Sequence, residues 1–323
     1  MRVTRGIPAA TDTPAALTIG NFDGVHLGHQ AMLAELRRAA ARLGVPACVL
    51  TFEPHPREFF APDRAPTRLT TLREKLELLA SFGVDRAHIC RFNYRFAQTT
   101  AEDFIEHIVV RGLGARWVQV GDDFRFGSRR AGSVVMLKQA APRFSFEVAA
   151  LPSVLLDGER VSSTALRQAL AAGELDRARR LSGHPYSITG RVVHGDGMGR
   201  KLGFPTANVQ MKHNRPPLTG IFAVEVHGVG RGPLPGAASL GVRPTVRLQG
   251  APVLEVHLLD FDGDLYRRHL RIEFLHKFRD EEKYADLALL TKQIALDVEN
   301  VKAFFRRRDA EAQRKVKGQI FPT

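Results

Sequence analysis

Hydrophobic positions in the first half of the chain alternate between short apolar runs and helical spacings. Leu17–Phe22 is an apolar run typical of a buried strand. From His26 to Leu43, apolar residues recur three or four positions apart, which predicts an amphipathic helix that stops before Gly44. Ala47–Phe52 is the next apolar run. Strand, helix and strand with short links predict a right-handed crossover between parallel strands.

The same rhythm continues through the first half of the chain. It predicts further helices over residues 71–82, 100–110, 134–140, 163–171 and 174–181 and strands over 87–92, 117–120 and 146–151. Thr100 and Asp103 resemble a capping box at the start of one of these helices. This alternation is typical of an α/β fold, a doubly wound domain with a parallel sheet.

The second half has short apolar and β-branched runs separated by Gly and Pro clusters. The runs predict strands over residues 188–193, 222–227, 237–240, 253–259 and 270–274, and this spacing favours a small antiparallel β-barrel. A terminal helix is predicted from apolar positions at Leu290, Ile294, Val298, Val301 and Phe305. We therefore expect two domains, residues 1–184 and 185–323.

Composition narrows the class of protein. The 323 residues are 44% hydrophobic and 25% charged, which is ordinary for a water-soluble chain with two cores. There is no apolar run of membrane-spanning length and no signal-peptide core, so we expect a cytoplasmic location and no membrane partner. Cys48 and Cys90 form no CxxC pair, which argues against a disulfide framework or a zinc site.

The net charge of +13 indicates an anionic partner, either nucleic acid, a membrane surface or phosphorylated small molecules. The basic run at residues 304–317, FFRRRDAEAQRKVK, is interpreted as a solvated helix face because no nucleic-acid-binding motif accompanies it. We therefore expect small-molecule partners and no nucleic acid. The sequence leaves the oligomeric state open.

A candidate phosphate site follows the first predicted strand. His26 and His29 lie three positions apart at the start of the predicted helix, so both rings share one face. A helix N-terminus attracts anions, and Gly28 lets a phosphate approach the backbone between the rings. Isolated histidines are usually structural, but this position at the carboxyl end of a strand favours a binding site.

A second candidate stretch starts the helix predicted over residues 163–171. Ser163 and Thr164 supply hydroxyl groups there, and Arg167 lies one turn further on. Helix capping explains one serine, whereas binding of a triphosphate explains the hydroxyls and the arginine together.

The second half has its own candidate site in the glycine-rich stretch from Gly195 to Asn208. A glycine-rich loop by itself is weak support, because turns also need glycine. If residues 205–208 are extended, Thr206 and Asn208 project to the same side and can bind Mg²⁺ together with ATP phosphates. Glu255 lies on the polar face of a predicted strand, either as a solvent-facing carboxylate or as a general base.

The longer motifs resemble one family. TIGNFDGVHLGHQ (residues 18–30), TFEPHP (51–56), GDDFRFG (121–127) and the SSTxxR segment are similar to the N-terminal module of bacterial bifunctional riboflavin kinase/FAD synthetases. GRKLGFPTANV (199–209), SLGVRPT (239–245) and LEVHLLDFDGDLY (254–266) resemble the riboflavin kinase module. The resemblance implies that the second domain phosphorylates riboflavin to FMN and the first transfers AMP from ATP to FMN, giving FAD and pyrophosphate, with ATP as co-substrate and Mg²⁺ as cofactor.

The resemblance also implies residue roles. His26 and His29 would stabilise the reacting phosphates, and Glu255 would be the catalytic base of the kinase. Thr206 and Asn208 would hold Mg²⁺ and ATP. The expected nucleotide or flavin contacts are Asn21, Phe22, Asp23, Gly24, Gly28, Asp123, Ser163, Thr164, Arg167, Gly195, Arg200 and Arg279, with the roles of Asp23 and Asp123 left open. Met198 and Arg267 depart from the usual family pattern.

Two other functions stay open. An adenylyltransferase for another phosphorylated substrate would explain His26, His29 and the SSTxxR segment, but not Thr206 and Asn208 together with Glu255. A flavin- or nucleic-acid-binding protein without turnover is the other alternative. The sparse aromatic residues near the basic tail speak against base-stacking recognition by such a protein.

Overall fold

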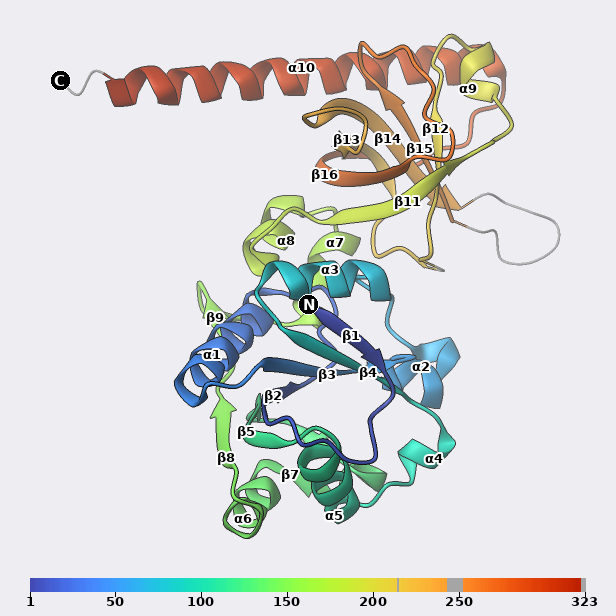
Figure 1. Ribbon diagram of the computed structural model, residues 1–323. Helices are drawn as coiled ribbons and strands as arrows, with labels where there is room; N and C mark the ends of the chain where they lie inside the picture. Colours follow the sequence, from blue (N-terminus) through green and yellow to red (C-terminus); the bar gives the residue numbers. More distant parts are fainter. Residues whose placement is uncertain (214, 243–251, 321–323) are drawn as a thin grey trace. The chain divides into compact units, whose positions relative to one another are not determined.

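The computed structural model describes residues 1–213, 215–242 and 252–320 of the chain. Its contacts define two compact units, Met1–Leu166 and Arg167–Thr323, joined through the helix α7 (Ser163–Ala171) (Figure 1). Each unit has its own sheet. The predicted domain boundary near residue 185 lies further along the chain than this division and stays a prediction.

The first unit is built on a six-stranded parallel sheet in the order β1-β4-β3-β2-β5-β8. Its strands are β1 (Arg2–Arg5), β2 (Ala15–Ile19), β3 (Ala47–Glu53), β4 (Arg86–Arg91), β5 (Ala115–Gly121) and β8 (Glu147–Leu151). The order reverses at β2, since β3 lies on one side of it and β5 on the other. The predicted doubly wound parallel sheet is therefore confirmed, and the crevice at β2 is where such folds bind ligands.

Helices and small hairpins connect these strands. The helices are α1 (Leu27–Leu43), α2 (Pro56–Phe60), α3 (Leu72–Ser81), α4 (Tyr94–Ala97), α5 (Ala101–Asp103), the π-helix η2 (Phe104–Gly112) and α6 (Val134–Phe144), with 3₁₀ turns η1 (Pro62–Arg64) and η3 (Ser128–Arg130). The hairpins pair β6 (Arg125–Phe126) with β7 (Gly132–Ser133) and β9 (Leu155–Leu156) with β10 (Glu159–Arg160).

The helix predicted over residues 100–110 is confirmed, although most of it has π winding. A single α-turn is followed by the π-helix η2. Thr100 Oγ1 accepts a hydrogen bond from the Asp103 amide at 3.0 Å, which confirms the cap at this end. Apolar spacing reports which face is buried and does not distinguish α from π winding. The strand β1 and the hairpins are too short to give a sequence pattern.

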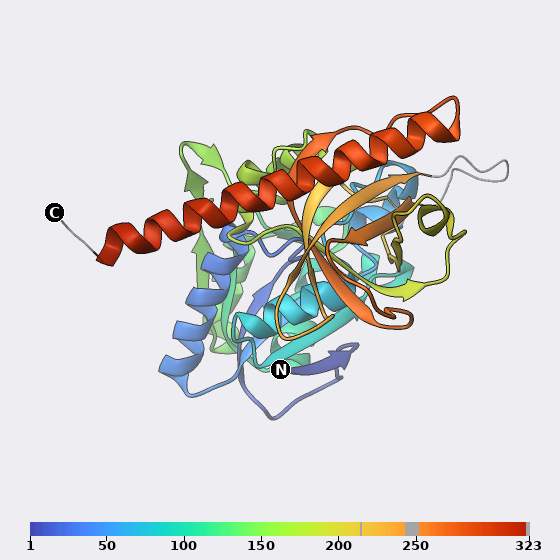
Figure 2. The same cartoon turned by 90° about the horizontal axis from the view of Figure 1, so that it is seen from above.

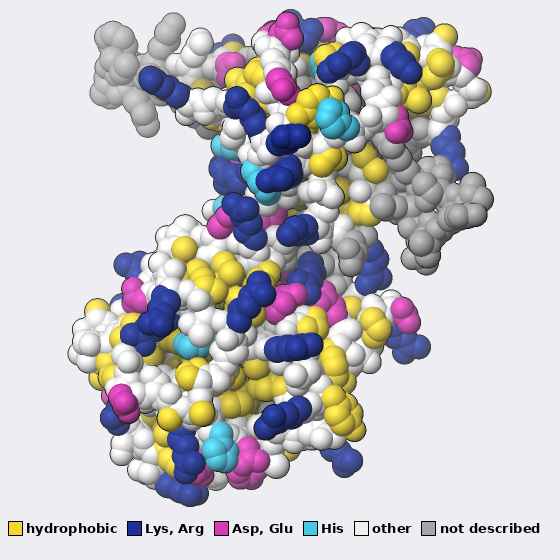
Figure 3. All heavy atoms as spheres, turned by 45° about the vertical axis from the view of Figure 1, so that its right-hand side comes forward, with side chains coloured by type: hydrophobic (Ala, Val, Ile, Leu, Met, Phe, Trp, Pro, Cys, Tyr) yellow, Lys and Arg dark blue, Asp and Glu magenta, His cyan; other side chains and the backbone are white. Residues whose placement is uncertain are grey.

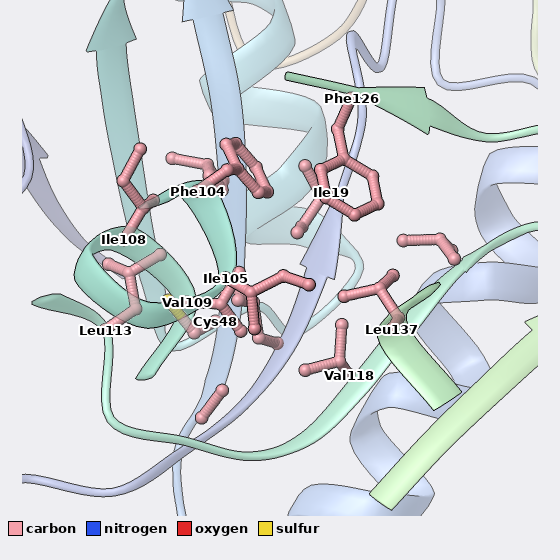
Figure 4. Close-up of a cluster of buried hydrophobic side chains, with 14 of the residues drawn as sticks. Ile19, Cys48, Phe104, Ile105, Ile108, Val109, Leu113, Val118, Phe126 and Leu137 are labelled. Atoms are coloured by element: carbon pink, nitrogen blue, oxygen red, sulfur yellow. The ribbon is translucent and has the colours of Figure 1, made fainter. Parts of the chain in front are cut away.

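The core of the first unit lies on both faces of the sheet. On one face, side chains from the sheet pack with η2 and α6, as Figure 4 shows for Ile19, Ile105, Val118 and Leu137. On the other face, α1 and α3 pack over Ala16 and Val49, and this cluster includes Phe22 and Val25. Successive residues of β2 thus point to opposite faces, and both faces are covered by helices, as expected for a parallel sheet.

The second unit is a closed barrel with strand order β11-β12-β15-β14-β13-β16, whose neighbouring strands are antiparallel. Its strands are β11 (Ser187–Val193), β12 (Ala207–Gln210), β13 (Gly220–His227), β14 (Leu234–Val242), β15 (Pro252–Leu258) and β16 (His269–Arg279), and its helices besides α7 are α8 (Leu175–Ser182), α9 (Met198–Lys201) and α10 (Leu287–Ile320). The predicted antiparallel barrel is confirmed. The expectation that residues 205–208 are extended is confirmed for Ala207 and Asn208, which belong to β12.

The terminal helix α10 packs on the outside of the barrel. Val298 and Val301 are buried against Ala223 of β13 and against Leu259. Seen from above, α10 runs across the barrel strands and extends beyond them (Figure 2). The predicted helix over the barrel is confirmed, and it starts before the predicted positions and ends after them.

Lys and Arg side chains are spread over the face shown in Figure 3 and do not gather into one patch. Among the described residues, none of the helices combines the length and the apolar character that crossing a membrane requires.

Candidate active sites

The first site starts in the loop between β2 and α1, which has an unusual backbone. Phe22, Gly24 and Val25 have φ values of 50°, 81° and 38°. Left-handed backbone is rare for phenylalanine and costly for a β-branched residue such as valine. Such conformations persist only where the surroundings impose them, and they cluster at functional sites.

The side chain of Asp23 is the main anchor of this loop. Its carboxylate accepts hydrogen bonds from the Leu69 and Thr70 amides at 3.0–3.1 Å and from the Thr70 hydroxyl at 3.1 Å. The Thr70 hydroxyl also accepts a bond from the Gly24 amide at 3.2 Å. Asp23 is buried. These bonds tie the loop to the segment that leads into α3.

His26 and His29 form a stacked pair at the N-terminus of α1. Their ring centroids are 3.7 Å apart and the planes differ by 18°. His26 is the residue before the helix, and its Nδ1 accepts a hydrogen bond from the His29 amide at 3.4 Å. A Cβ at Gly28 would lie 3.2 Å from the His26 ring, so glycine leaves room for the stack. The expectation that both rings share one face is confirmed.

The electrostatics of the pair depend on burial. Burial lowers the pKa of His29 well below 6.5, and electrostatic interactions with His26 and Lys75 lower it further. His29 Nδ1 is buried and has no hydrogen-bond partner among the described residues. His29 is therefore uncharged at neutral pH, and a bound phosphate would raise its pKa.

Asn21 and Phe22 lie in the loop that leads to the histidine pair. The Asn21 carbonyl accepts a hydrogen bond from the Thr51 hydroxyl at 3.2 Å. The Phe22 ring is fully buried, and its centroid lies 5.0 Å from that of His29. Phe22 thus packs beside His29 and helps to shape the loop.

The SSTxxR segment meets the same loop. Ser163 Oγ donates a hydrogen bond to the Asp23 carbonyl oxygen at 2.9 Å, while the Thr164 side chain is exposed. Arg167 is partly buried one turn further along α7. Asp123 instead forms an exposed ion pair with Arg160 at 2.7 Å. The structure therefore joins Ser163 to the histidine loop and gives Asp123 a loop-bracing contact.

Aromatic residues that the sequence interpretation missed lie at the same edge of the sheet. Phe59 and Phe60 of α2 contact Phe92, which follows β4, with ring centroids 5.5 Å apart. The Phe60 side chain is 67% exposed. An exposed aromatic cluster at the carboxyl ends of parallel strands offers a stacking surface for a planar ligand. Its members come from separate motifs, and a single sequence gives no signal that they meet.

The second site is a row of side chains across five barrel strands. Asn208 of β12 pairs with Glu255 of β15, and Glu255 pairs with Ser239 of β14. Ser239 pairs with Ile221 of β13, and Ile221 with Arg279 of β16. Cross-strand partners point to the same face of a sheet. The register therefore places Asn208 beside Glu255, with Arg279 three strands further along the same row.

A pocket of about 550 Å³ lies over the part of this row that runs from Glu255 to Arg279, and Asn208 is not among its lining residues. It is lined by residues of β14, β15, β16, α9 and α10, including Thr206, Ser239, Glu255, Arg279, Tyr284 and Asp297. Gly195 packs directly against Asn208, because a Cβ at Gly195 would lie 2.3 Å from Asn208 Nδ2. Arg200 is exposed on α9. Of the SLGVRPT motif, Arg243, Pro244 and Thr245 lie outside the described residues.

Arg279 is fixed by the terminal helix. Its guanidinium donates to both carboxylate oxygens of Asp297 on α10, at 3.0 and 2.6 Å. The hydrogen bond to Asp297 raises the pKa of Arg279 and keeps it charged. Gln293 donates to the same carboxylate at 3.0 Å. Ser239 and Glu281 are a second pair that the sequence interpretation missed, with 2.7 Å between hydroxyl and carboxylate oxygen.

Both residues that depart from the usual family pattern, Met198 and Arg267, belong to the described part of the chain. Met198 is 51% exposed at the pocket edge. Arg267 has a φ of 66°, a conformation that glycine adopts more readily.

Comparison with known proteins supports this two-site organisation. The family model for FAD synthetase matches residues 9–165, and that for riboflavin kinase matches residues 182–305. These matches cover the α/β unit and the barrel, and define an enzyme that combines two phosphate-transfer activities in one chain.

Similar proteins share both halves. A protein of Escherichia coli (strain K12) named bifunctional riboflavin kinase/FMN adenylyltransferase is 47% identical over 311 residues, covering 94% of this chain and 98% of that protein. A protein of Pseudomonas fluorescens with the same name is 51% identical over 286 residues, covering 88% of this chain and 91% of that protein. This chain belongs to the bifunctional riboflavin kinase/FMN adenylyltransferase family.

Among solved structures, a Streptococcus pneumoniae protein described as a macrolide-efflux protein matches with a TM-score of 0.80 at 28% identity. The match covers 94% of this chain and 99% of that one, so the two proteins share the fold over nearly their whole length.

Proposed function

We propose specific residue roles for the two reactions of this family, which the chain carries out in series. The riboflavin kinase domain uses ATP to make FMN from riboflavin, and the FAD synthetase domain joins AMP from ATP to FMN. The substrates and products are therefore small molecules: ATP, riboflavin, FMN, FAD and pyrophosphate. A cytoplasmic location and the absence of a nucleic-acid partner stay predictions from the sequence.

In the first unit, a phosphate oxygen of FMN attacks the α-phosphorus of ATP in line, and pyrophosphate leaves. No covalent enzyme intermediate is needed, so the protein contributes positioning and charge stabilisation. We assign His26 and His29 as donors to the reacting phosphates, and an uncharged His29 gains a proton more readily once phosphate is bound. Ser163, Thr164 and Arg167 are assigned to the β- and γ-phosphates, and the Phe59, Phe60 and Phe92 cluster to the flavin ring.

In the second unit, Glu255 accepts the proton of the ribityl 5′-hydroxyl as that oxygen attacks the γ-phosphorus of ATP, the bond to the β,γ-bridging oxygen breaks, and ADP leaves. The Thr206 hydroxyl and the Asn208 amide oxygen are the hard oxygen donors that suit Mg²⁺. A magnesium ion held there would neutralise phosphate charge. Gly195 and Arg200 lie on the glycine-rich stretch assigned to ATP, and Arg279 is assigned to the flavin.

The observation that carries the proposal is the separation of the two sites. The stacked imidazole pair belongs to the parallel sheet of one unit, and the Asn208–Glu255–Arg279 row belongs to the barrel of the other. Each site has its own group for phosphate chemistry, so a change in one should leave the other reaction intact.

Paired variants test this separation. The protein is incubated with ATP and Mg²⁺ and either riboflavin or FMN, and the flavins are separated by chromatography. We expect His29→Ala to keep FMN formation and to lose most FAD formation, by roughly 10²–10⁴-fold for a group that acts in the transition state. Glu255→Ala should lose FMN formation and keep FAD formation from supplied FMN. One variant abolishing both reactions would contradict the assignment.

A further inference from the structure

Lys75 on α3 is a buried lysine with no role in the mechanism above. It is 5% exposed and lies one turn before Leu79, a fully buried member of the cluster that contains Phe22 and Val25. The face of α3 that carries Lys75 therefore packs toward the histidine loop. A charged group at a core position is costly to bury, so its presence there needs a reason.

The carboxylates near Lys75 already bind other groups. Asp23 accepts hydrogen bonds from Leu69 and Thr70. Glu53 and Glu58 both bind the guanidinium of Arg68, in bonds of 2.8 Å to Glu53 and 2.5 Å to Glu58. Among the described residues, the Lys75 ammonium group makes no hydrogen bond or ion pair. The lysine is thus a donor without a partner in the free protein.

Lys75 interacts electrostatically with Asp23 and His29 of the histidine loop. Burial lowers the pKa of Lys75, and the carboxylates of Asp23, Glu53 and Glu58 oppose this effect. Lys75 in turn helps to lower the pKa of His29. The packing agrees with this, because Leu79 on the same face of α3 belongs to the cluster of Phe22, whose ring centroid lies 5.0 Å from that of His29.

We propose that Lys75 is a positioning residue of the adenylyl-transfer site, whose buried ammonium group adds a fixed positive charge beside His29 for the phosphates of ATP and FMN. This inference rests on the assignment of His29 to that reaction. A fixed charge in a partly desolvated site attracts phosphate more strongly than one in water and needs no reorganisation when the substrate arrives.

The test replaces the charge and keeps the shape, with Lys75→Met measured for FAD formation from FMN and ATP. We expect kcat/KM for FAD formation to fall about tenfold, a loss typical of removing one nearby charge. The thermal midpoint should stay level or rise, because an apolar side chain suits the buried position better than an unpaired ammonium group. Riboflavin kinase activity of the same protein should be unchanged.

Lys138→Met is the matched control, because Lys138 is an exposed lysine on α6 of the same unit. It removes the same charge and should change neither activity. The pKa of His29, followed by NMR, should rise in Lys75→Met and stay constant in Lys138→Met, a shift that a purely structural lysine near neither imidazole would not cause. Lys75→Gln serves as a second neutral variant if Lys75→Met does not fold.

The outcomes distinguish the inference on Lys75 from the assignment of His29 to adenylyl transfer. If His29→Ala loses FAD formation while Lys75→Met and Lys75→Gln retain it, only the inference on Lys75 is overturned. If His29→Ala retains FAD formation, the assignment of the site itself fails. If both Lys75 variants lose FAD formation only in proportion to their loss of folded protein at the assay temperature, Lys75 is structural and the inference is overturned.

Discussion

Two aspartates illustrate how much burial changes the role of one residue type. Asp23 is 5% exposed and accepts bonds from Leu69 and Thr70, whereas the Asp123 side chain is 68% exposed and pairs with Arg160. Sequence motifs singled out both and distinguished neither. Only the surroundings show that Asp23 holds the loop of the imidazole pair.

Asp23→Asn should destabilise the first unit by about 1–3 kcal/mol, because the amide turns one acceptor into a donor that faces other donors. Asp123→Asn should cost less than about 1 kcal/mol, since an exposed ion pair contributes little. Urea unfolding followed by the signal of Trp117, the single tryptophan of the chain, measures both values. Equal effects of the two substitutions would contradict the bracing role of Asp23.

Other residue-level expectations held because they depend on neighbours in sequence. The three-residue spacing of His26 and His29 on a helix start led directly to the stacked pair. The positive φ of Arg267 lies where the resemblance had marked an unusual residue. Local spacing determines these features, and no distant contact is needed to infer them.

At the scale of elements, α10 packs on the barrel and also holds a residue of β16. It buries Val298 and Val301 on the barrel and supplies Asp297, which fixes Arg279 at the end of β16. The apolar spacing of the sequence predicted the packing face of this helix. It could not show that an acidic residue on the same helix holds an arginine of the kinase pocket.

Asp297→Asn should loosen Arg279 and raise the KM for riboflavin several-fold, because the guanidinium loses a charge-assisted pair. The second unit should lose roughly 1–3 kcal/mol of stability, as expected for a buried bond to a charged group. Glu299→Gln on the same helix is the control, since Glu299 is 60% exposed where it pairs with Lys302. Steady-state kinetics with riboflavin, and FAD formation as an internal standard, measure the effect. An unchanged KM would argue against a flavin role for Arg279.

At the scale of the whole molecule, the contacts and the sequence pattern place the boundary between the units at different residues. Division by contacts places α8 with the barrel, where it packs on β16 and buries Leu175, Ala178 and Leu181. The pattern of the sequence placed the boundary near residue 185, after α8. Because α8 follows the alternating rhythm of the first half, periodicity alone assigns it to that half.

Two fragments distinguish these divisions. Residues 167–323 should be more stable than residues 185–323 by about 3–6 kcal/mol, the contribution of burying two leucine side chains. Thermal unfolding and riboflavin kinase activity of each fragment provide the measurement. Equal stability of the two fragments would support a boundary near residue 185.

The sequence by itself determined the longer strands and helices, the parallel sheet, the barrel and the motifs that resemble the family. These features are set by neighbours within a few positions, where side-chain periodicity and turn residues act. The tertiary structure decided which residues meet: Asn208 with Glu255, Glu255 with Ser239, and Asp23 with Thr70. Such contacts depend on strand register and helix packing between distant segments. A register shift of one residue would turn every side chain of a strand to the other face, so only the folded arrangement fixes them.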